Sequence, residues 1–586
     1  MLKKIKNIIF ALGVIATPSS LISCNPLIRF YNIFSLSETD LVPADLINDK
    51  EVKINSLSNS YSFRNKFIKI FEHKENKEAY VNLVNIFQQL PEFFDGVRIT
   101  KSKRNPDIFI LTNTQYNSAI LFSIKENRIY FNDMHHFDYL RFITHNPTLK
   151  NNKIKIEYKK RHISKTYKYF DLNKYNMNVY EQDKNIFIPF SLFNLLFISP
   201  NYLSLYYNNK QMYLLDFLLN EENKESEINA ILDRNTLQKR LQTSAERETN
   251  YNYIKFVFEN LYGNRKEFLE KHKYQTFEEF FEKTGLKERI LSPDSAVYTD
   301  AYIEFVHKYV DELHTTLKHA SYFNDKDYRL SAPDNMSKKF NFSTKLHKSN
   351  QANKLVLDSK IKNGRTKHDH GNIEIIDDIA FIDISSFALN KDENRSIYNI
   401  MQQNMRLIKA RKIKNVVINI AENGGGNVVE METLAGYFSN NEQYVDRFDN
   451  VTREITKIGI KTDTNEDSEF DERDGYSDIN WYLIVSEYTF SAGNLITKIA
   501  KNNKNVKVIG KQTGGGMYSI MPIILPDGTG LIISSNNGYT SSALKEGELK
   551  YEYDNIENGV MVDIPLEYED FFNYEKIAKQ IKEGKI

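Results

Sequence analysis

A serine between a predicted strand and a predicted helix is the residue of this chain best placed to do chemistry. The apolar run Tyr482 to Val485 predicts a strand, and Ser491 follows it after a short turn. Apolar residues then recur at helical spacing, namely Leu495, Ile496, Ile499 and Ala500. A hydroxyl at such a turn lies beside unpaired N–H groups and the positive end of a helix dipole, which suits an acyl-transfer nucleophile. Serine is also a favoured N-cap, so a purely structural role is the alternative.

A run of three glycines, Gly424-Gly425-Gly426, supplies candidate N–H donors for an oxyanion. It directly follows the strand predicted at Val416 to Ile420. Glycine lets the backbone come close to a ligand with its N–H exposed. The run is not a phosphate-binding loop, because no GK[ST] follows it and the third glycine of a dinucleotide fingerprint is missing. A plain turn into a helix is the alternative.

Strands and helices alternate around these two motifs. Further strands are predicted at Ile379 to Ile384, Val506 to Ile509, Ile520 to Leu525 and Gly530 to Ser534, and helices at Asp392 to Ala410 and through Leu434 and Tyr437. This alternation predicts an α/β core with mostly parallel pairing. Sites on such cores lie at the carboxyl ends of strands, where the glycine run and Ser491 both fall.

A strongly helical region precedes the core. Its last helix carries Tyr302, Phe305, Val306, Tyr309 and Leu313 at three- and four-residue steps. We expect Ser295 or Thr299 to cap this helix and the helix to run into residues 311–316. The polar residues from about Asn324 to Gly371 are expected to be a long loop or crossing segment.

The order of three segments, IDISSF, NIAENGGGN and EYTFSAGN followed by VKVIGKQTGGG, resembles the carboxyl-terminal processing and tricorn-core family of serine peptidases. The resemblance covers roughly Tyr251 to Glu567. It implies a crotonase/ClpP-like α/β peptidase core in which Ser491 is the nucleophile. It also implies that the N–H of Ala492 and that of Gly425, or of its neighbour Gly424, form the oxyanion hole.

The two branches of that family differ in the general base. One branch uses a lysine 25 positions after the serine, where this chain has Gly516, and Lys511 comes too early to replace it. The other, tricorn-like branch takes a histidine from a motif similar to L-x-D-x-H-T, which residues 310–315 fit loosely. The resemblance therefore implies that His314 is the base, with His319 as a nearby competitor. A structural histidine on an amphipathic helix is the alternative.

The tricorn-like branch also orients its base with a glutamate near the C-terminus. A segment resembling E-N-x-G-V-x-P-D places Glu557 in that role, and a surface carboxylate is the alternative. Two positions depart from the family pattern. Leu313 stands where tricorn has a serine, and Val562 stands where a proline is usual.

The N-terminus carries the only cysteine, Cys24, so no intramolecular disulfide can form. Three lysines, Lys3, Lys4 and Lys6, precede the short apolar run Ile8 to Ile15. With Leu21 to Cys24, this resembles a bacterial lipoprotein signal, which implies cleavage before Cys24 and lipid on its sulfur and amine. A buried cysteine in an N-terminal anchor is the alternative. We expect a body anchored by lipid in the bilayer at the extracytoplasmic face of the cell membrane.

The chain is long enough, at 586 residues, for several domains. We predict a signal peptide (1–23), a linker (24–50), an accessory mixed α+β domain (51–223), a connector (224–250), a helical subdomain carrying the base (251–330) and the α/β peptidase core (371–586). The accessory region has a hairpin signal turning at Asn208-Asn209 and a weak internal repeat. Its expected role is that of a spacer or a substrate- or partner-binding domain.

Composition argues against several classes of partner. Lys and Arg total 78 against 77 Asp and Glu, so there is no basic field for nucleic acid. No cofactor motif is present. His135-His136 and His368-Asp369-His370 lack the spacing of known zinc motifs, so we expect them to be solvated and predict no metal.

Three functions follow from these residues. The first is a membrane-tethered serine endopeptidase that hydrolyses a polypeptide substrate through an acyl-enzyme at Ser491. The second is a catalytically inactive surface binding protein or adhesin on the same fold, which the departures at Leu313 and Val562 keep open. The third is an esterase or amidase with the same nucleophile.

Overall fold

The structure is a computed structural model of the whole chain. It describes residues 41–58, 61–94, 96–113, 118–137, 148, 151–162, 166–216, 240–323, 344–366, 370–389, 393–541 and 553–586. Cys24, the connector up to residue 239 and His368 therefore lie outside the described residues. Within the described ranges, the helices are all too short or too polar to traverse a lipid bilayer.

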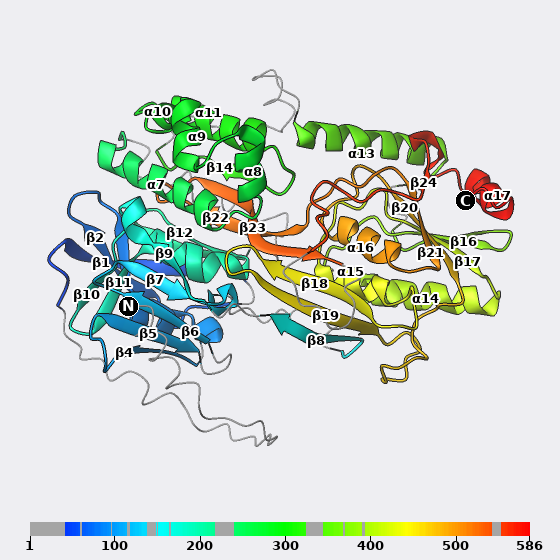
Figure 1. The fold of residues 1–586 in the computed structure, drawn as a ribbon, viewed down its shortest axis with the longest axis horizontal. Helices are drawn as coiled ribbons and strands as arrows, with labels where there is room; N and C mark the ends of the chain where they lie inside the picture. Colours follow the sequence, from blue (N-terminus) through cyan, green and yellow to red (C-terminus); the bar gives the residue numbers. More distant parts are fainter. Residues whose placement is uncertain are drawn as a thin grey trace.

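A six-stranded, mostly parallel sheet forms the predicted α/β core. Its strands are β15 (Ile373–Ile376), β16 (Ile379–Asp383), β17 (Asn415–Asn419), β20 (Asn480–Val485), β21 (Val506–Gly510) and β24 (Ile564–Pro565), in that spatial order. All neighbours from β16 to β24 pair in parallel, and only β15 is antiparallel. The predicted fold class is thus confirmed. Figure 1 shows this sheet in the right half of the molecule.

Helices cover both faces of the core sheet. On one face lie α14 (Ile397–Ala410), α15 (Val428–Ala435) and α16 (Ala492–Lys501), and on the other lie α13 (Lys345–Lys362) and α17 (Tyr574–Lys582). In α14 the residues Ile397, Met401, Met405 and Ile408 are buried, at steps of three and four that put them on one side of a helix. The sheet is therefore the middle layer of a three-layer core.

A second six-stranded sheet joins the core to the rest of the chain. Its main path runs β14 (Thr316–His319), β23 (Gly530–Thr540), β18 (Gln443–Asp449), β19 (Glu454–Thr462) and β8 (Ile154–His162), and β22 (Tyr518–Ile524) pairs with β23. Strand β8 belongs to the expected accessory region, yet it pairs antiparallel with β19 from Ile154 opposite Thr462 to His162 opposite Ile455. The N-terminal part of the chain thus contributes a strand to the core.

Two further sheets build the N-terminal region. One contains β1 (Leu46–Ser56), β2 (Phe67–His73), β3 (Ala79–Asn82), β10 (Tyr180–Gln182), β11 (Asn185–Pro189), β12 (Leu203–Tyr207) and β13 (Gln211–Asp216). The other contains β4 (Val97–Lys101), β5 (Ile108–Asn113), β6 (Ser118–Ser123), β7 (Arg128–Phe131) and β9 (Lys168–Asp171). The hairpin predicted around Asn208-Asn209 is confirmed, because β12 pairs antiparallel with β13.

Short helices complete this region, namely α2 (Leu83–Gln89), α3 (Pro91–Phe94), η1 (Met134–Phe137), η3 (Leu172–Tyr175), α5 (Phe190–Phe193), η4 (Asn194–Ile198) and η5 (Ser199–Asn201). Two further short helices, η8 (Glu393–Arg395) and η9 (Tyr568–Asp570), belong to the α/β core. The apolar side chains of the N-terminal region join those of the helical subdomain in one continuous core. The division into domains stays a prediction.

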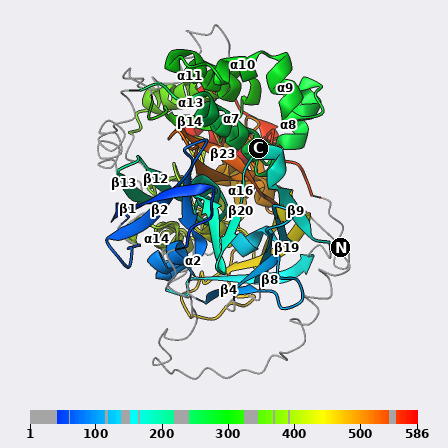
Figure 2. The ribbon, with the colours of Figure 1, turned by 90° about the vertical axis from the view of Figure 1, so that its left-hand side faces the viewer.

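The helical subdomain consists of α7 (Ser244–Asn260), α8 (Arg265–His272), α9 (Phe277–Lys283), α10 (Leu286–Ile290), α11 (Ser295–Glu304) and η7 (Phe305–Val310). Figures 1 and 2 show these helices above the strands of the N-terminal region. Two details of the prediction were wrong. The cap of α11 is Asp294, which accepts from the N–H of Ala296, and the helix ends at Val310, where Asp311 turns into the left-handed region.

The polar segment expected to be a loop contains an 18-residue helix, α13. The prediction failed because the helix buries few apolar side chains, among them Ala352 and Val356. Thr344 caps it by accepting from the N–H of His347. Its side chain Lys360 is buried and pairs with Glu422, which follows β17, so a charge contact helps to hold the helix on the sheet.

Candidate active site

Ser491 lies at a sharp turn between β20 and α16, as predicted. Its backbone has φ 56° and ψ −118°, a conformation that costs a non-glycine residue roughly 1–3 kcal/mol. The turn is held from both sides: Ser486 Oγ donates to the carbonyl of Ala421 at 2.6 Å, and the N–H of Ser491 donates to the carbonyl of Gly515 at 2.9 Å. The Ser491 side chain makes no N-cap hydrogen bond. A serine kept strained without a capping role favours the chemical interpretation over the structural one.

The glycine run lies directly against this serine. A Cβ built on Gly425, whose φ is +103°, would stand 2.8 Å from Cβ of Ser491 and 3.2 Å from the nitrogen of Ala492. A Cβ on Gly424 would meet only Tyr488, at 3.4 Å or more. Only glycine therefore fits at position 425, where the backbone of the β17 turn meets the first turn of α16.

The N–H groups at this junction differ in their partners. The N–H of Gly425 donates to Oδ1 of Asn423 at 2.8 Å, and Asn423 is itself fixed by donating to the carbonyl of Ile384 at 3.1 Å. Among the described residues, the N–H groups of Gly424 and Ala492 have no hydrogen-bond acceptor. Such open donors at a helix N-terminus and an adjoining turn are what a developing oxyanion requires.

His314 lies beside the serine turn in space, although it is far from it in sequence. It follows the end of η7 and precedes β14, and its ring packs against Phe490 with 4.5 Å between ring centroids. The side chain is buried, and burial lowers the pKa of His314 from 6.5 to about 3 because it disfavours the charged ring. His314 is thus neutral at physiological pH. No hydrogen bond links it to Ser491 in the structure, and Nδ1 has no partner among the described residues. His319 follows in β14, opposite Gly530.

Glu557 is buried near the same turn rather than on the surface. Its two carboxylate oxygens accept from Asn264 Nδ2 at 2.9 Å and from the N–H of Met517 at 2.8 Å. Burial, together with the neighbouring carboxyl of Glu312, raises the pKa of Glu557 to about 8. Glu312 accepts from the hydroxyls of Thr315 and Ser534, and burial raises its pKa too. Two buried carboxyl groups therefore lie next to the histidine's segment, and no hydrogen bond joins Glu557 to His314.

The loop that carries Glu557 is tied to the helix that begins at Ser491. Asn494 Nδ2 donates to the carbonyl of Ile556 at 2.9 Å, and its Oδ1 accepts from Thr513 Oγ1 at 2.6 Å. The N–H of Gly516 in turn donates to the carbonyl of Glu557 at 3.1 Å. The structure thus brings together Ser491, the glycine turn, His314 and Glu557 from four separate segments.

The lysine alternative has no support in this geometry. A Cβ on Gly516 would stand 2.2 Å from the ring of Phe490, so no side chain fits there without moving that ring. Lys511 instead pairs with the exposed Glu567, with its Nζ 3.0 Å from both carboxylate oxygens. Neither position 516 nor Lys511 therefore supplies a lysine base to Ser491.

Asn423, Asn494 and Thr513 were missed by sequence reasoning. All three are buried and position the backbone of the site through side-chain hydrogen bonds. A signal was available for the two asparagines, because Asn423 lies two residues before Gly425 and Asn494 lies three residues after Ser491. Buried amides so close to a site commonly hold its loops in place.

The expectation that the histidine pairs are solvated was wrong. His135, His136 and His370 are half-buried. His136 Nδ1 lies 3.1 Å from the carbonyl oxygen of Ala119, and His370 Nδ1 accepts from the N–H of Ser385 at 3.1 Å. Short-range sequence showed no motif, whereas residues distant in the chain bury these rings.

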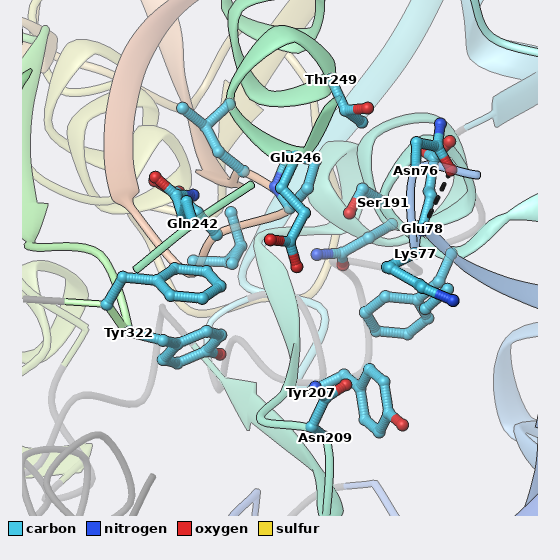
Figure 3. Close-up of a pocket in the computed structure, with 18 residues that line it drawn as sticks. Asn76, Lys77, Glu78, Ser191, Tyr207, Asn209, Gln242, Glu246, Thr249 and Tyr322 are labelled. Carbon is cyan, nitrogen blue, oxygen red and sulfur yellow. Dashed lines mark hydrogen bonds between the residues drawn. The ribbon is translucent and has the colours of Figure 1, made fainter. Parts of the chain in front are cut away.

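A small cavity lies apart from this site, where the N-terminal region, α7 and the end of β22 meet. Its volume is about 70 Å³. Figure 3 shows Glu246 of α7 with Tyr322 and Tyr207 around this cavity. None of the predicted site residues lines it, so this cavity is separate from the candidate site at the serine turn.

Residues 378–554 match the sequence model described as Peptidase family S41, a range that contains Ser491 and the glycine run but not His314 or Glu557. Among curated proteins, none matches the chain significantly.

Solved structures with some similarity include three of different kinds. The photosystem II D1 C-terminal processing protease is 20% identical over 33% of this chain and 43% of its own, with a TM-score of 0.26. A lipoprotein from Streptococcus agalactiae is 15% identical over 52% of this chain and 88% of its own, with a TM-score of 0.31. The tricorn protease is 19% identical over 36% of this chain and 18% of its own, with a TM-score of 0.20. The similar part thus spans less than half of the processing protease.

Proposed function

We propose, from the premise that residues 378–554 of this chain are a domain of peptidase family S41, that the protein is a serine endopeptidase tethered to a membrane. Its substrate is a polypeptide, and its nucleophile is Ser491. The strained turn of Ser491, faced by a glycine that leaves no room for a side chain, is the observation that carries this proposal.

The proposed reaction begins with proton transfer from the Ser491 hydroxyl to His314. The buried His314 ring is neutral and can therefore accept a proton, although the same burial makes the charged ring costly to form. The serine oxygen then attacks a peptide carbonyl, and the N–H of Ala492 and one from Gly424 or Gly425 stabilise the oxyanion. His314 returns the proton to the leaving amine, and water hydrolyses the acyl-enzyme by the reverse sequence.

Two features of the site must change for this reaction to proceed. Ser491 and His314 must close to hydrogen-bonding distance, as catalytic groups often do only when substrate binds. The N–H of Gly425 must share or leave its acceptor Asn423 if this donor, rather than that of Gly424, serves the oxyanion. Glu557 acts indirectly, because it holds the backbone of Met517 and the loop beneath Ser491.

The proposed location rests on the N-terminal sequence. The basic residues before Ile8 to Ile15 and the single cysteine at the end of Leu21 to Cys24 are typical of a bacterial lipoprotein. Lipid on Cys24 would anchor the body at the extracytoplasmic face of the cell membrane. Replacing Cys24 by Ala should move the protein from the membrane fraction to the soluble fraction in fractionated cells.

Labelling with a fluorophosphonate probe tests the nucleophile. The full chain should label covalently, Ser491→Ala should not label, and His314→Ala should label far more slowly. His319→Ala serves as the matched histidine control and should label like the unmodified chain. Loss of labelling in His319→Ala instead of His314→Ala would assign the base to His319.

A second candidate is a binding protein that kept this fold without catalysis. The observation that favours it is that His314 makes no hydrogen bond to Ser491 and that its Nδ1 has no partner among the described residues. If the folded chain does not label while a control peptidase does, the endopeptidase proposal is wrong and the binding function replaces it. Labelling without cleavage of a peptide library, but with cleavage of esters, would identify an esterase.

A further inference from the structure

Three metal-binding side chains meet where the N-terminal region touches the core. Asp133 and His135 belong to the segment of η1, which follows β7, and Glu454 is the first residue of β19. One potential ligand atom of each residue lies within 4.8 Å of the other two. The cluster is separate from the serine site and plays no part in the proposed reaction.

Burial distinguishes this cluster from the acidic groups common on protein surfaces. Asp133 is 3% exposed and Glu454 is 2% exposed, and His135 is half-buried beside them. Two carboxylates so close together repel each other, and removal from water makes each negative charge more costly. A divalent cation between them would lower these costs beyond what partners within the chain do, such as the N–H of His135 that donates to Asp133.

The ligands are presented by rigid elements. Oδ1 of Asp133 accepts from the N–H of His135 at 2.8 Å, which fixes the aspartate on its own turn. Met134 and Phe137 of η1 are buried in the core that the N-terminal region shares with the helical subdomain. On the other side, Ile455 next to Glu454 is buried in the core of the peptidase domain. The site therefore joins two hydrophobic cores.

A neighbouring histidine supports the aspartate from outside the cluster. His136 Nε2 lies 3.8 Å from Oδ2 of Asp133, and its Nδ1 lies 3.1 Å from the carbonyl oxygen of Ala119. A ring held in this way orients the carboxylate beside it. Outer partners of this kind are typical of metal sites, where they fix the direction of a ligand.

We propose that Asp133, His135 and Glu454 bind a divalent transition-metal ion, with Zn²⁺ as the best match. One imidazole nitrogen and two carboxylate oxygens are ligands that zinc accepts, and three protein ligands leave a position for water. The nitrogen ligand and the small number of oxygens disfavour Ca²⁺ and Mg²⁺. Zinc holds its ligand atoms at about 2.0–2.2 Å, a spacing that atoms within 4.8 Å of one another can reach by small movements of their side chains.

The ion would act as a structural link. It would fix η1 of the N-terminal region to the hairpin of β18 and β19, close to where β8 joins the same sheet. Because binding to the folded state alone stabilises that state, Zn²⁺ should raise the Tm of the protein. This role is independent of whether Ser491 is catalytic.

Metal titration of the untagged full chain tests the proposal. After removal of metal with a chelator, calorimetry should show one Zn²⁺ bound per chain, and Co²⁺ in its place should give visible absorption bands. Glu454→Gln, Asp133→Asn and His135→Gln should each weaken binding by more than the roughly 10- to 100-fold that loss of an outer partner costs. These variants should also lose the increase in Tm with Zn²⁺.

Glu442→Gln is the matched control, because Glu442 lies just before β18 and pairs with Lys159 instead. It should bind Zn²⁺ like the unmodified chain. Circular dichroism without metal shows whether each variant is folded. If the folded, unmodified chain binds no Zn²⁺ or Co²⁺, or if all three folded variants bind as tightly as it does, the proposal is wrong.

Discussion

The ring of Phe490 links His314 to Ser491, the proposed nucleophile, because Phe490 directly precedes Ser491 and its ring centroid lies 4.5 Å from that of His314. The same ring covers Gly516, at a distance that excludes even a Cβ. Gly516 stands where one branch of the family that this chain resembles has a lysine. The absence of a side chain at Gly516 thus makes room for the phenyl ring that packs against His314.

Phe490→Leu should move the ring of His314 without destabilising the fold. Leucine keeps an apolar side chain but loses the flat surface against the imidazole, so we expect kcat to fall by about 100-fold, as a small misplacement of a catalytic group does. The Tm should change little because Phe490 is only half-buried. Peptidase kinetics and thermal unfolding measure the two effects. An unchanged kcat would show that the ring contact does not position the base.

Gly425→Ala and Gly424→Ala form a matched pair. At position 425 the new methyl group would stand 2.8 Å from Cβ of Ser491 on a backbone with φ +103°, whereas at 424 it would meet only Tyr488 at ordinary contact distance. We expect the first variant to lose about 10²–10³ in kcat/KM, because the clash would displace the turn and misplace its N–H donors, with an effect like that of removing an oxyanion donor. The second should keep most activity. Equal losses in both would contradict the role given to the close approach at Gly425.

The pH dependence of kcat/KM should lack the usual histidine limb near pH 6.5. A base works when unprotonated, and burial lowers the pKa of His314 to about 3, so activity should persist well below pH 6.5. The unfolded chain, in which this histidine has its usual pKa, binds a proton near pH 6.5, so stability falls as the pH drops from there. Circular dichroism must therefore confirm the fold at each pH. A limb at 6.5 in a folded protein would identify a solvated base instead.

Glu557→Gln should change how stability depends on pH. The carboxyl loses its proton near pH 4.5 when unfolded and near 8 when folded, so its contribution to the free energy of unfolding declines by about 1.4 kcal/mol per pH unit across that window. Glutamine does not titrate. The free energy of unfolding of the variant should therefore rise relative to that of the unmodified chain as the pH increases from 4.5 to 8. Denaturant unfolding at pH 5 and pH 8 measures the difference.

The exposed Glu575 provides the control for this measurement. Glu575→Gln should leave the pH dependence of unfolding as it is in the unmodified chain. If Glu557→Gln also leaves it unchanged, Glu557 is ionised in the folded protein, and its two hydrogen bonds outweigh its burial.

Sequence patterns over a few residues predicted those elements whose structure depends mainly on neighbouring residues. The strand, turn and helix around Ser491 and the hairpin of β12 and β13 follow from the period of their apolar residues and from their turn residues. Helix α13 was missed because it needs little apolar surface, with a buried Lys360 among its few inward side chains.

Contacts distant in the chain explain the remaining differences. Glu557 is buried by Asn264 and Met517, and the half-buried His135 lies beside Glu454, pairings for which the sequence carries no short-range signal. The left-handed residue Asp311 ends the helix before His314 without any glycine to mark the stop. Such sites form only when the tertiary structure is complete.

The pairing of strand β8 with β19 also limits when their sheet can form while the chain is being synthesised. Its partner β19 leaves the ribosome about 300 residues later, so the edge of β8 must wait unpaired while the helical subdomain and half of the core are made. Contacts between such distant segments slow folding, and an open strand edge favours association with other chains. Nascent chains that end before residue 454 should therefore be the form of this protein that most needs a chaperone.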